Sequence, residues 1–336
     1  MHACARARVI GDVAWGCALY ATVLCFFLHD TAEACWREIT GRGDLTLDQR
    51  VFIELRLPRA ILCLLVGATL GAGGTLMQAL FRNPIVEPGL IGTSSGAAFG
   101  AALFYVFGSF LKIDFGGWTL PVMACGGGVL STYLVFALSR TKHEGRSSIL
   151  RLLLTGLAIN ALFLSGIGFL SYVARDPAAR SIIYWNLGTM SGADWKSVFV
   201  VGVATTFGLL PATFLAKHLN ALMIGEDEAV ALGVNVRRLK WLVLGLNVLM
   251  VAVATAFTGI ISFVGLIVPH ILRIVRGPDN RFLIPASALL GGTLLSVADL
   301  IARVCVRPAE LPIGIVTAAV GVPVFLSLLR SRKYMS

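Results

Sequence analysis

Charged residues are scarce in this 336-residue sequence. They make up 14% of the chain, whereas an ordinary soluble domain carries about 25%. Hydrophobic residues make up 57%, and the mean hydropathy is +0.83. So few charges cannot cover the surface of a soluble fold that contains this much apolar material. The composition therefore excludes a soluble enzyme and predicts that lipid covers much of the chain.

Catalytic and metal-binding patterns are missing as well. The sequence has no G-x-x-x-x-G-K-[ST], G-x-S-x-G or H-E-x-x-H motif, and its five histidines are scattered. Its seven cysteines form no C-x-x-C pair, and most lie in apolar runs as small hydrophobic residues. We therefore expect no catalytic activity, disulfide framework, metal site or cofactor in this chain. Any energy for work must come from another chain.

The sequence does have long runs without Asp, Glu, Lys or Arg, and a membrane helix needs about 20 apolar residues. Such runs cover 60–80, 88–111, 115–139, 152–174, 197–216, 282–298 and 311–329. The run 241–272 is too long for one helix and contains glycines and a proline, so we divide it into one full and one short span. With Val9–Leu28 these make ten spans. The pattern predicts an all-α polytopic membrane protein with a single transmembrane domain, residues 1–336.

The first span has a second interpretation as a secretory signal peptide. Arg6 and Arg8 precede it, and Thr31-Ala32-Glu33-Ala34 could serve as a cleavage site. We favour an uncleaved span, because an even number of spans requires this helix.

Charge sidedness supports ten spans. With both termini on one side, that side carries 17 of the 28 basic residues and 7 of the 18 acidic ones, a net +10. The other side carries 11 of each and is neutral. Because basic loops stay in the cytoplasm, we expect both termini to be cytoplasmic. The excess positive charge is then a topology signal, and we expect no nucleic-acid partner.

Two outward segments contain candidate binding residues. The loop His29–Arg59 ends in Arg56-Leu57-Pro58-Arg59, whose arginines either snorkel at the interface or form a docking surface for an acidic partner. The loop Tyr172–Lys196 combines arginines with aromatic residues, which either anchor the membrane interface or face a large anionic, partly apolar ligand. Tyr172 and Arg175 are three residues apart, so they share a helix face if the fifth span reaches that far.

Two cytoplasmic segments also stand out. Gln78–Gly89 contains two prolines and predicts a tight reversal. The glycines Gly92, Gly96 and Gly100 follow at intervals of four and indicate a helix-packing groove.

The other segment, Leu222–Val234, lies within a longer stretch at about 217–240 and predicts two short helices on the membrane surface. It is either a solvated connector or a coupling element for a cytoplasmic motor. The coupling candidates are Gly225, Glu226, Glu228, Ala229 and Gly233.

Several motifs, in order along nearly the whole chain, resemble the iron-siderophore, heme and cobalamin permease family of ABC importers (FecCD-type). They are Arg56-Leu-Pro-Arg59, Gln78 with Arg82-Asn83-Pro84, Glu87-Pro88-Gly89-Leu-Ile-Gly92, Tyr184-Trp185-Asn186-Leu187-Gly188, the run from Gly259 to Arg273, and Ala309-Glu310-Leu311-Pro312-Ile313-Gly314 with Gly321-Val-Pro323.

The resemblance implies a type II ABC importer permease fold and a homodimer in the bacterial inner membrane. It further implies a pathway on the two-fold axis, a periplasmic substrate-binding protein, and two cytoplasmic ATPase subunits that bind ATP and Mg. It assigns Arg56, Arg59 and Arg303 to docking of the binding protein.

The resemblance favours heme as the substrate. The segment Gly156–Leu162 followed by Tyr172, Arg175 and Arg180 is most similar to heme permeases. Tyr172, Arg175 and Met190 are therefore the substrate-pathway candidates, because heme combines two propionates with a flat apolar ring. A ferric siderophore or cobalamin is the alternative within the family. An ion-coupled secondary transporter is the alternative from another class, with Asp299 as its candidate carboxylate.

Overall fold

The computed structural model describes residues 47–111, 116–139, 149–306 and 308–330. Every regular element in these ranges is helical. In chain order they are α2 (Leu47–Val51), the π-helix η1 (Phe52–Arg56), α3 (Leu57–Phe81), α4 (Thr93–Leu111), the 3-10 turn η2 (Gly116–Trp118), α5 (Thr119–Ser139), α6 (Ile149–Val173), α7 (Ala178–Asn186), α8 (Trp195–Ile224), α9 (Glu226–Ala231), α10 (Val236–Thr258), α11 (Val264–Arg276), α12 (Asn280–Val304) and α13 (Ile313–Arg330).

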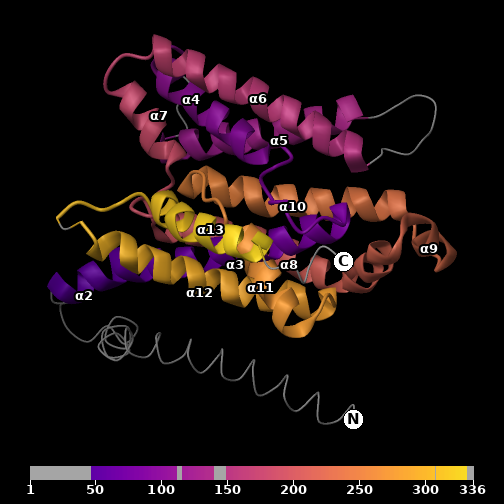
Figure 1. Ribbon diagram of the computed structural model, residues 1–336. Helices are drawn as coiled ribbons and strands as arrows, with labels where there is room; N and C mark the ends of the chain where they lie inside the picture. Colours follow the sequence, from indigo (N-terminus) through magenta and orange to yellow (C-terminus); the bar gives the residue numbers. More distant parts are fainter. Residues whose placement is uncertain (1–46, 112–115, 140–148, 307, 331–336) are drawn as a thin grey trace.

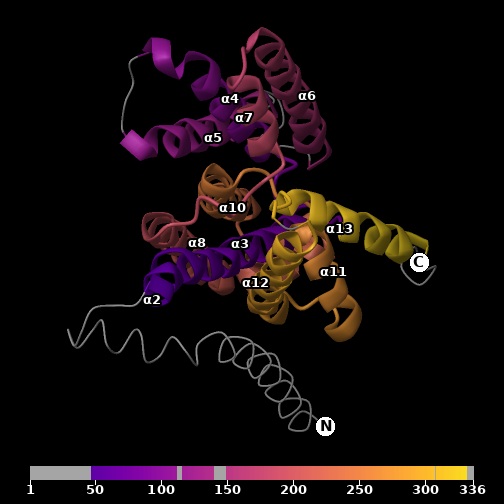
Figure 2. The same cartoon turned by 90° about the vertical axis from the view of Figure 1, so that its left-hand side faces the viewer.

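The helices form two layers (Figures 1 and 2). One layer contains α4, α5, α6 and α7, and the other contains α3, α8, α11, α12 and α13. Helix α10 contacts α4 and α5 on one side and α3 and α8 on the other, so it joins the layers. Helices α2 and α7 lie at one end of the molecule, which we call the α7 end, and α9 lies at the opposite, α9 end.

The predicted spans correspond to helices wherever the structure describes them. Six helical stretches in the described residues are long and apolar enough to cross a membrane: Gln49–Phe81, Gly116–Ser139, Arg151–Val173, Trp195–Ile224, Val236–Thr258 and Asn280–Val304. Helices α4, α11 and α13 supply three further predicted spans. The division of 241–272 is also confirmed, because α10 ends at Thr258 and α11 begins at Val264. The predicted span Val9–Leu28 lies outside the described residues.

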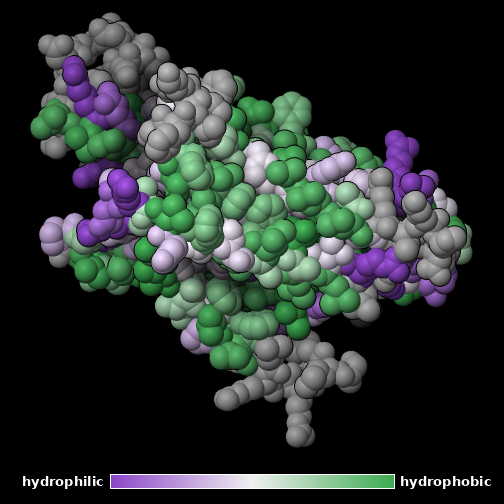
Figure 3. Space-filling model, turned by 90° about the horizontal axis from the view of Figure 1, so that it is seen from above, coloured by the Kyte–Doolittle hydropathy of each residue, from purple (hydrophilic) through white to green (hydrophobic). Residues whose placement is uncertain are grey.

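The surface matches this assignment. Hydrophobic residues cover the middle of the molecule in Figure 3, and hydrophilic residues gather toward its two ends. On α8, the side chains of Phe199, Phe207 and Phe214 are 71%, 67% and 79% exposed. Exposed phenylalanines along a long apolar helix mark a surface that lipid or another protein chain covers.

The connection between α3 and α4 forms turns at 82–92, where the sequence predicts a tight reversal. It folds back among the helices, because Asn247 Nδ2 donates to the Pro88 carbonyl at 3.2 Å. The half-buried Glu87 carboxylate accepts the Phe263 backbone N–H at 2.7 Å, just before α11. Phe263 has a φ of 70°, a left-handed conformation that is strained for a phenylalanine. The Glu87 hydrogen bond therefore helps to hold the chain where α11 begins.

Glycines set the closest helix contacts. On α3, a Cβ at Gly67 would meet the Gly291 carbonyl of α12, and a Cβ at Gly74 would meet the Gly265 carbonyl of α11. The predicted packing groove is confirmed on α4, where a Cβ at Gly96 would meet the Gly127 carbonyl of α5. Small residues let membrane helices approach until their backbones touch.

Hydroxyl and amide groups form hydrogen bonds across these close contacts. Thr69 and Thr205 join α3 to α8 at 2.7 Å, and Thr75 donates to Ser287 of α12 at 2.8 Å. Gln78 donates to the Gly265 carbonyl at 3.2 Å. Each bond satisfies a polar group that has no access to water, so the register of α3 against its neighbours is fixed.

Replacing Gly291 by Val should separate α3 from α12. Its side chain would overlap the Gly67 backbone, so we expect a loss of stability at least as large as the about 1 to 3 kcal/mol typical of overpacking. The apparent melting temperature of the purified protein in detergent measures the effect. Gly245→Val is the matched control, because Gly245 is exposed on α10 with no atom within 4 Å of its Cβ position. Equal melting temperatures for the two variants would contradict the packing account.

Candidate functional site

At the α7 end, η1 holds Arg56 in an exposed position just before α3. The indole N–H of Trp195, at the start of α8, donates to the Ile53 carbonyl of η1 at 3.1 Å. Helix α8 itself begins with a capping box, in which the Asp194 carboxylate accepts the Ser197 N–H at 2.7 Å. The Trp195 hydrogen bond attaches η1 to the start of α8, and Arg56 at the end of η1 is exposed to a partner.

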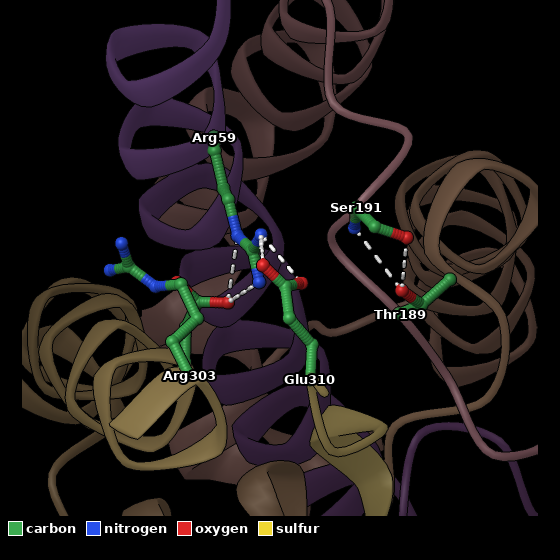
Figure 4. A network of polar contacts seen from close by, with 6 residues as sticks. Arg59, Thr189, Ser191, Arg303 and Glu310 are labelled. Carbon is green, nitrogen blue, oxygen red and sulfur yellow. Dashed lines mark hydrogen bonds and ion pairs between the residues drawn. The ribbon is translucent and has the colours of Figure 1, made fainter. Parts of the chain in front are cut away.

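Arg59 lies three residues further along and has a different environment (Figure 4). Its Nε and Nη2 donate to Asp299 Oδ1 of α12 at 3.0 and 2.8 Å. Its Nη1 donates to both carboxylate oxygens of Glu310, at 3.0 and 2.9 Å. The Arg59 side chain is only 15% exposed. Arg59 therefore already pairs with two carboxylates of its own chain.

Asp299 also pairs with the third predicted docking residue. Arg303 Nε lies 3.0 Å from Asp299 Oδ2, one helical turn along α12. The side chain of Asp299 is 3% exposed, and the two arginines compensate its charge. Such a carboxylate fits a structural ion pair better than the coupling site of an ion-driven transporter, for which Asp299 was the sequence candidate.

The segment after α12 connects these charges to the start of α13. The Leu311 N–H donates to the Ala302 carbonyl at 3.1 Å. The N–H groups of Ile313 and Gly314 donate to the Gly188 and Leu187 carbonyls, at 3.1 and 3.0 Å. Glu310 therefore lies on a short segment that is bonded to α12 on one side and to the end of α7 on the other.

The predicted substrate residues are only partly brought together. Tyr172 is 89% exposed near the end of α6, and Arg175 is exposed beside it. Helix α6 ends at Val173, so the condition under which Tyr172 and Arg175 would share a helix face is not met. The two side chains lie close in sequence on the surface, but a turn carries Arg175.

Met190 is placed differently from Tyr172 and Arg175. Its side chain is 2% exposed and belongs to the hydrophobic cluster that also contains Leu62, Val198 and Ile313. The thioether offers no surface to a ligand in this conformation. The neighbouring Thr189 hydroxyl bonds to the Ser191 hydroxyl at 2.7 Å (Figure 4), so the polar groups of this turn bond to each other.

At the α9 end, the predicted coupling segment forms one short helix, not two. Helix α8 continues to Ile224, and α10 begins at Val236, which leaves only α9 between them. The sequence prediction missed that α8 is 30 residues long and takes up the first part of the segment. Gly233 follows α9 with a φ of 79°, and its Cβ position is open. Glycine is therefore needed there for backbone conformation.

Helix α9 is attached to α10 by two contacts. Ala229 is fully buried in the cluster that contains Val236 and Leu239. Lys240 Nζ donates to Glu226 Oε1 at 2.8 Å, and the Lys240 side chain is 10% exposed. Glu226, a predicted coupling residue, thus pairs within the chain, while Glu228 is exposed.

Exposed apolar residues surround these contacts. Ile224, Val230 and Leu232 are 71%, 55% and 65% exposed. These side chains lie at the end of α8, on α9 and just after α9, and they fit a protein partner better than water.

Two of these contacts were not predictable from the sequence. Glu310 meets Arg59 across 251 positions, and no local pattern indicates a pair at that separation. Lys240 and Glu226 are 14 positions apart and meet only because the chain turns back after α9. The Asp299–Arg303 pair had a usable signal, because residues at i and i+4 on a helix face each other.

The comparisons with known proteins agree with this architecture. The family model described as the FecCD transport family matches residues 17–331. The hemin transport system permease protein HmuU of Yersinia pestis is 40% identical over 287 residues, 85% of each chain. The cobalamin import system permease protein BtuC of Halobacterium salinarum is 37% identical over 99% of this chain and 84% of that protein.

A solved structure extends the likeness to three dimensions. It is described as an inward-facing conformation of a metal-chelate type ABC transporter. It has a TM-score of 0.77 at 34% identity, and the match covers 86% of this chain and 90% of the other. The agreement covers most of the helical arrangement described above.

Exchanging the charges of Glu226 and Lys240 should preserve the attachment of α9. Lys240→Glu alone places two carboxylates together in a mostly buried position, and we expect a loss of about 2 kcal/mol. Adding Glu226→Lys should restore most of the melting temperature in detergent. Arg237→Glu, an equal charge reversal on the exposed side of α10, should have little effect. A double variant as unstable as Lys240→Glu alone would show that the pair does not hold α9.

Proposed function

This chain belongs to the FecCD transport family, and we propose that it is the permease subunit of an ATP-driven importer that carries heme across the inner membrane. It is a multi-span transport permease, not an enzyme, and it works with ATPase and substrate-binding partners. Heme, the inner membrane and the stoichiometry of the assembly belong to the proposal.

The observation that supports heme as the substrate is the exposure of Tyr172 near the end of α6 and of Arg175 just after it. Heme has two propionates on a flat apolar ring, so it needs cationic donors beside aromatic surface. Arg175 supplies a planar fork that binds a carboxylate through two hydrogen bonds. Tyr172 supplies an aromatic ring that is 89% exposed. The relative named as a hemin permease, at 40% identity, supports the same substrate.

Cobalamin is the second candidate. The relative named as a cobalamin permease aligns over 99% of this chain at 37% identity. Cobalamin has no free carboxylate pair comparable to the propionates of heme, so it would have less use for Arg175. Dependence of import on this arginine therefore distinguishes the two substrates.

The assembly we propose is a homodimer with two ATPase subunits, which bind the ATP and Mg. Both termini then lie in the cytoplasm, as charge sidedness predicts. At the α9 end, α9 and the residues that flank it expose Ile224, Val230 and Leu232, which suits this segment to bind in a cleft of the ATPase and transmit its closure. The α7 end faces the periplasmic binding protein, and there Arg56 has the exposure that docking requires.

Replacing Arg175 by Ala should slow heme import by about tenfold, because a charge-assisted bidentate contact is lost. The rate of labelled heme uptake into proteoliposomes that contain the complete importer measures this. Assembly and ATP hydrolysis without substrate should be unchanged. Arg180→Ala is the matched control, because Arg180 is also exposed but pairs with Asp176 at 3.4 Å. Import at the normal rate by the Arg175 variant would contradict the role of this arginine.

Docking of the binding protein should depend on Arg56. A surface ion pair contributes about 0 to 1 kcal/mol, and reversal adds repulsion in both copies of a dimer. We therefore expect Arg56→Glu to weaken docking by about tenfold at low salt and less at high salt. Arg59 is unsuitable for this test, because a glutamate there would face Asp299 and Glu310.

The matched control for Arg56→Glu is Arg50→Glu, which reverses an equally exposed charge on α2. Titration of the labelled binding protein against the importer in nanodiscs gives both affinities. If the two variants dock equally well, docking responds to overall charge and Arg56 has no specific role.

A further inference from the structure

The two carboxylates on Arg59 differ in one respect that matters for a partner. Asp299 binds the Nε and Nη2 side of the guanidinium and is 3% exposed. Glu310 binds Nη1 with both oxygens and is 46% exposed. Asp299 therefore fixes the arginine from a buried position, while the exposed Glu310 occupies the other side of the guanidinium (Figure 4).

We propose that Glu310 is an exchangeable ligand of Arg59, which a carboxylate of the docking substrate-binding protein replaces. This inference rests on the docking surface in the proposed function and adds a residue to it. Glu310 keeps the outward donors of Arg59 occupied until the binding protein arrives. Docking then exchanges one carboxylate for another, and Glu310 is released to water.

The balance of charge favours such an exchange over simple addition. Arg59 and Arg303 together match the charges of Asp299 and Glu310. A third carboxylate added to this group would carry uncompensated negative charge near a surface of low dielectric, which is unfavourable. Replacement keeps the charge balanced. It also gives the incoming carboxylate the charge-assisted contact with Nη1 that Glu310 now makes.

Release of Glu310 would have a structural consequence. The glutamate precedes Ile313 and Gly314 by three and four residues, and their N–H groups bond to the carbonyls at the end of α7. The side chain of Glu310 thus attaches this segment to α3. The backbone of the segment, through the N–H groups of Leu311, Ile313 and Gly314, attaches it to α12 and to the end of α7. Exchange would free the first attachment and keep the others. Docking of the binding protein would in this way change the attachment of the segment that leads into α13.

The test compares Glu310→Gln and Glu310→Asp with the wild-type importer, with affinity for its own substrate-binding protein as the measurement at low salt. Glutamine removes the charge of the internal ligand. Aspartate keeps the charge but is one methylene shorter, so it cannot make the same two-oxygen contact with Arg59. Both variants should dock the binding protein about three- to fivefold more tightly, the gain expected when an exposed ion pair no longer competes.

Controls separate exchange from a general change of charge. Glu54→Gln removes an exposed charge near Arg56 and should change the affinity by less than twofold. If docking responds only to net charge, Glu310→Gln and Glu54→Gln will tighten it equally and Glu310→Asp will not change it, and this overturns the proposal. Unchanged or weaker docking by both Glu310 variants also overturns it, as does a wild-type importer that docks no binding protein.

The effect of the Glu310 variants on docking affinity does not depend on which substrate the importer carries. Glu310 variants that dock more tightly on an importer that carries cobalamin would support the exchange and contradict heme. An importer that carries heme but docks its binding protein with the same affinity in the Glu310 variants would support heme and contradict the exchange.

Discussion

Backbone contact along α3 is the constraint on which the other helices depend. Gly67 and Gly74 leave no room for a side chain against α12 and α11, so these helices can pack on α3 only in one register. In hydrocarbon no hydrophobic effect pulls helices together, and close packing with interhelical hydrogen bonds must do so. Thr69 and Thr75 add those bonds at the same faces. The result is a well-defined body that can carry functional groups at both ends.

Ion pairs hold the functional segments to this body. At the α7 end, Asp299 fixes Arg59 across α3 and α12. At the α9 end, the Glu226–Lys240 pair fixes α9 to α10. In both places an exposed group lies beside the fixed one: Glu310 near Arg59 and Val230 on α9. A transporter that binds an ATPase at one end and a substrate-binding protein at the other can use this combination. Each partner contacts an exposed group, and the buried ion pair transmits the movement to the helices.

The sequence was sufficient for the spans that the structure describes, because lipid requires long uncharged helices and leaves a clear pattern. It also predicted the glycine groove on α4, since spacing by four places residues on one face. It could not predict the return of 82–92 into the bundle, where Pro88 meets Asn247, because polar residues in a reversal usually lie at the surface. The partners of Arg59 come from remote helices, and the burial of Met190 depends on tertiary packing, which no local pattern encodes.

The central claim is that this permease serves heme. The most direct measurement is the rate of ATP hydrolysis by the complete importer in nanodiscs, with the binding protein empty, loaded with heme or loaded with cobalamin. Substrate-specific stimulation reports that the ligand has been recognised by the whole assembly. Our account predicts that heme raises the rate well above that of the empty binding protein and that cobalamin does not. Stimulation by cobalamin alone would contradict it.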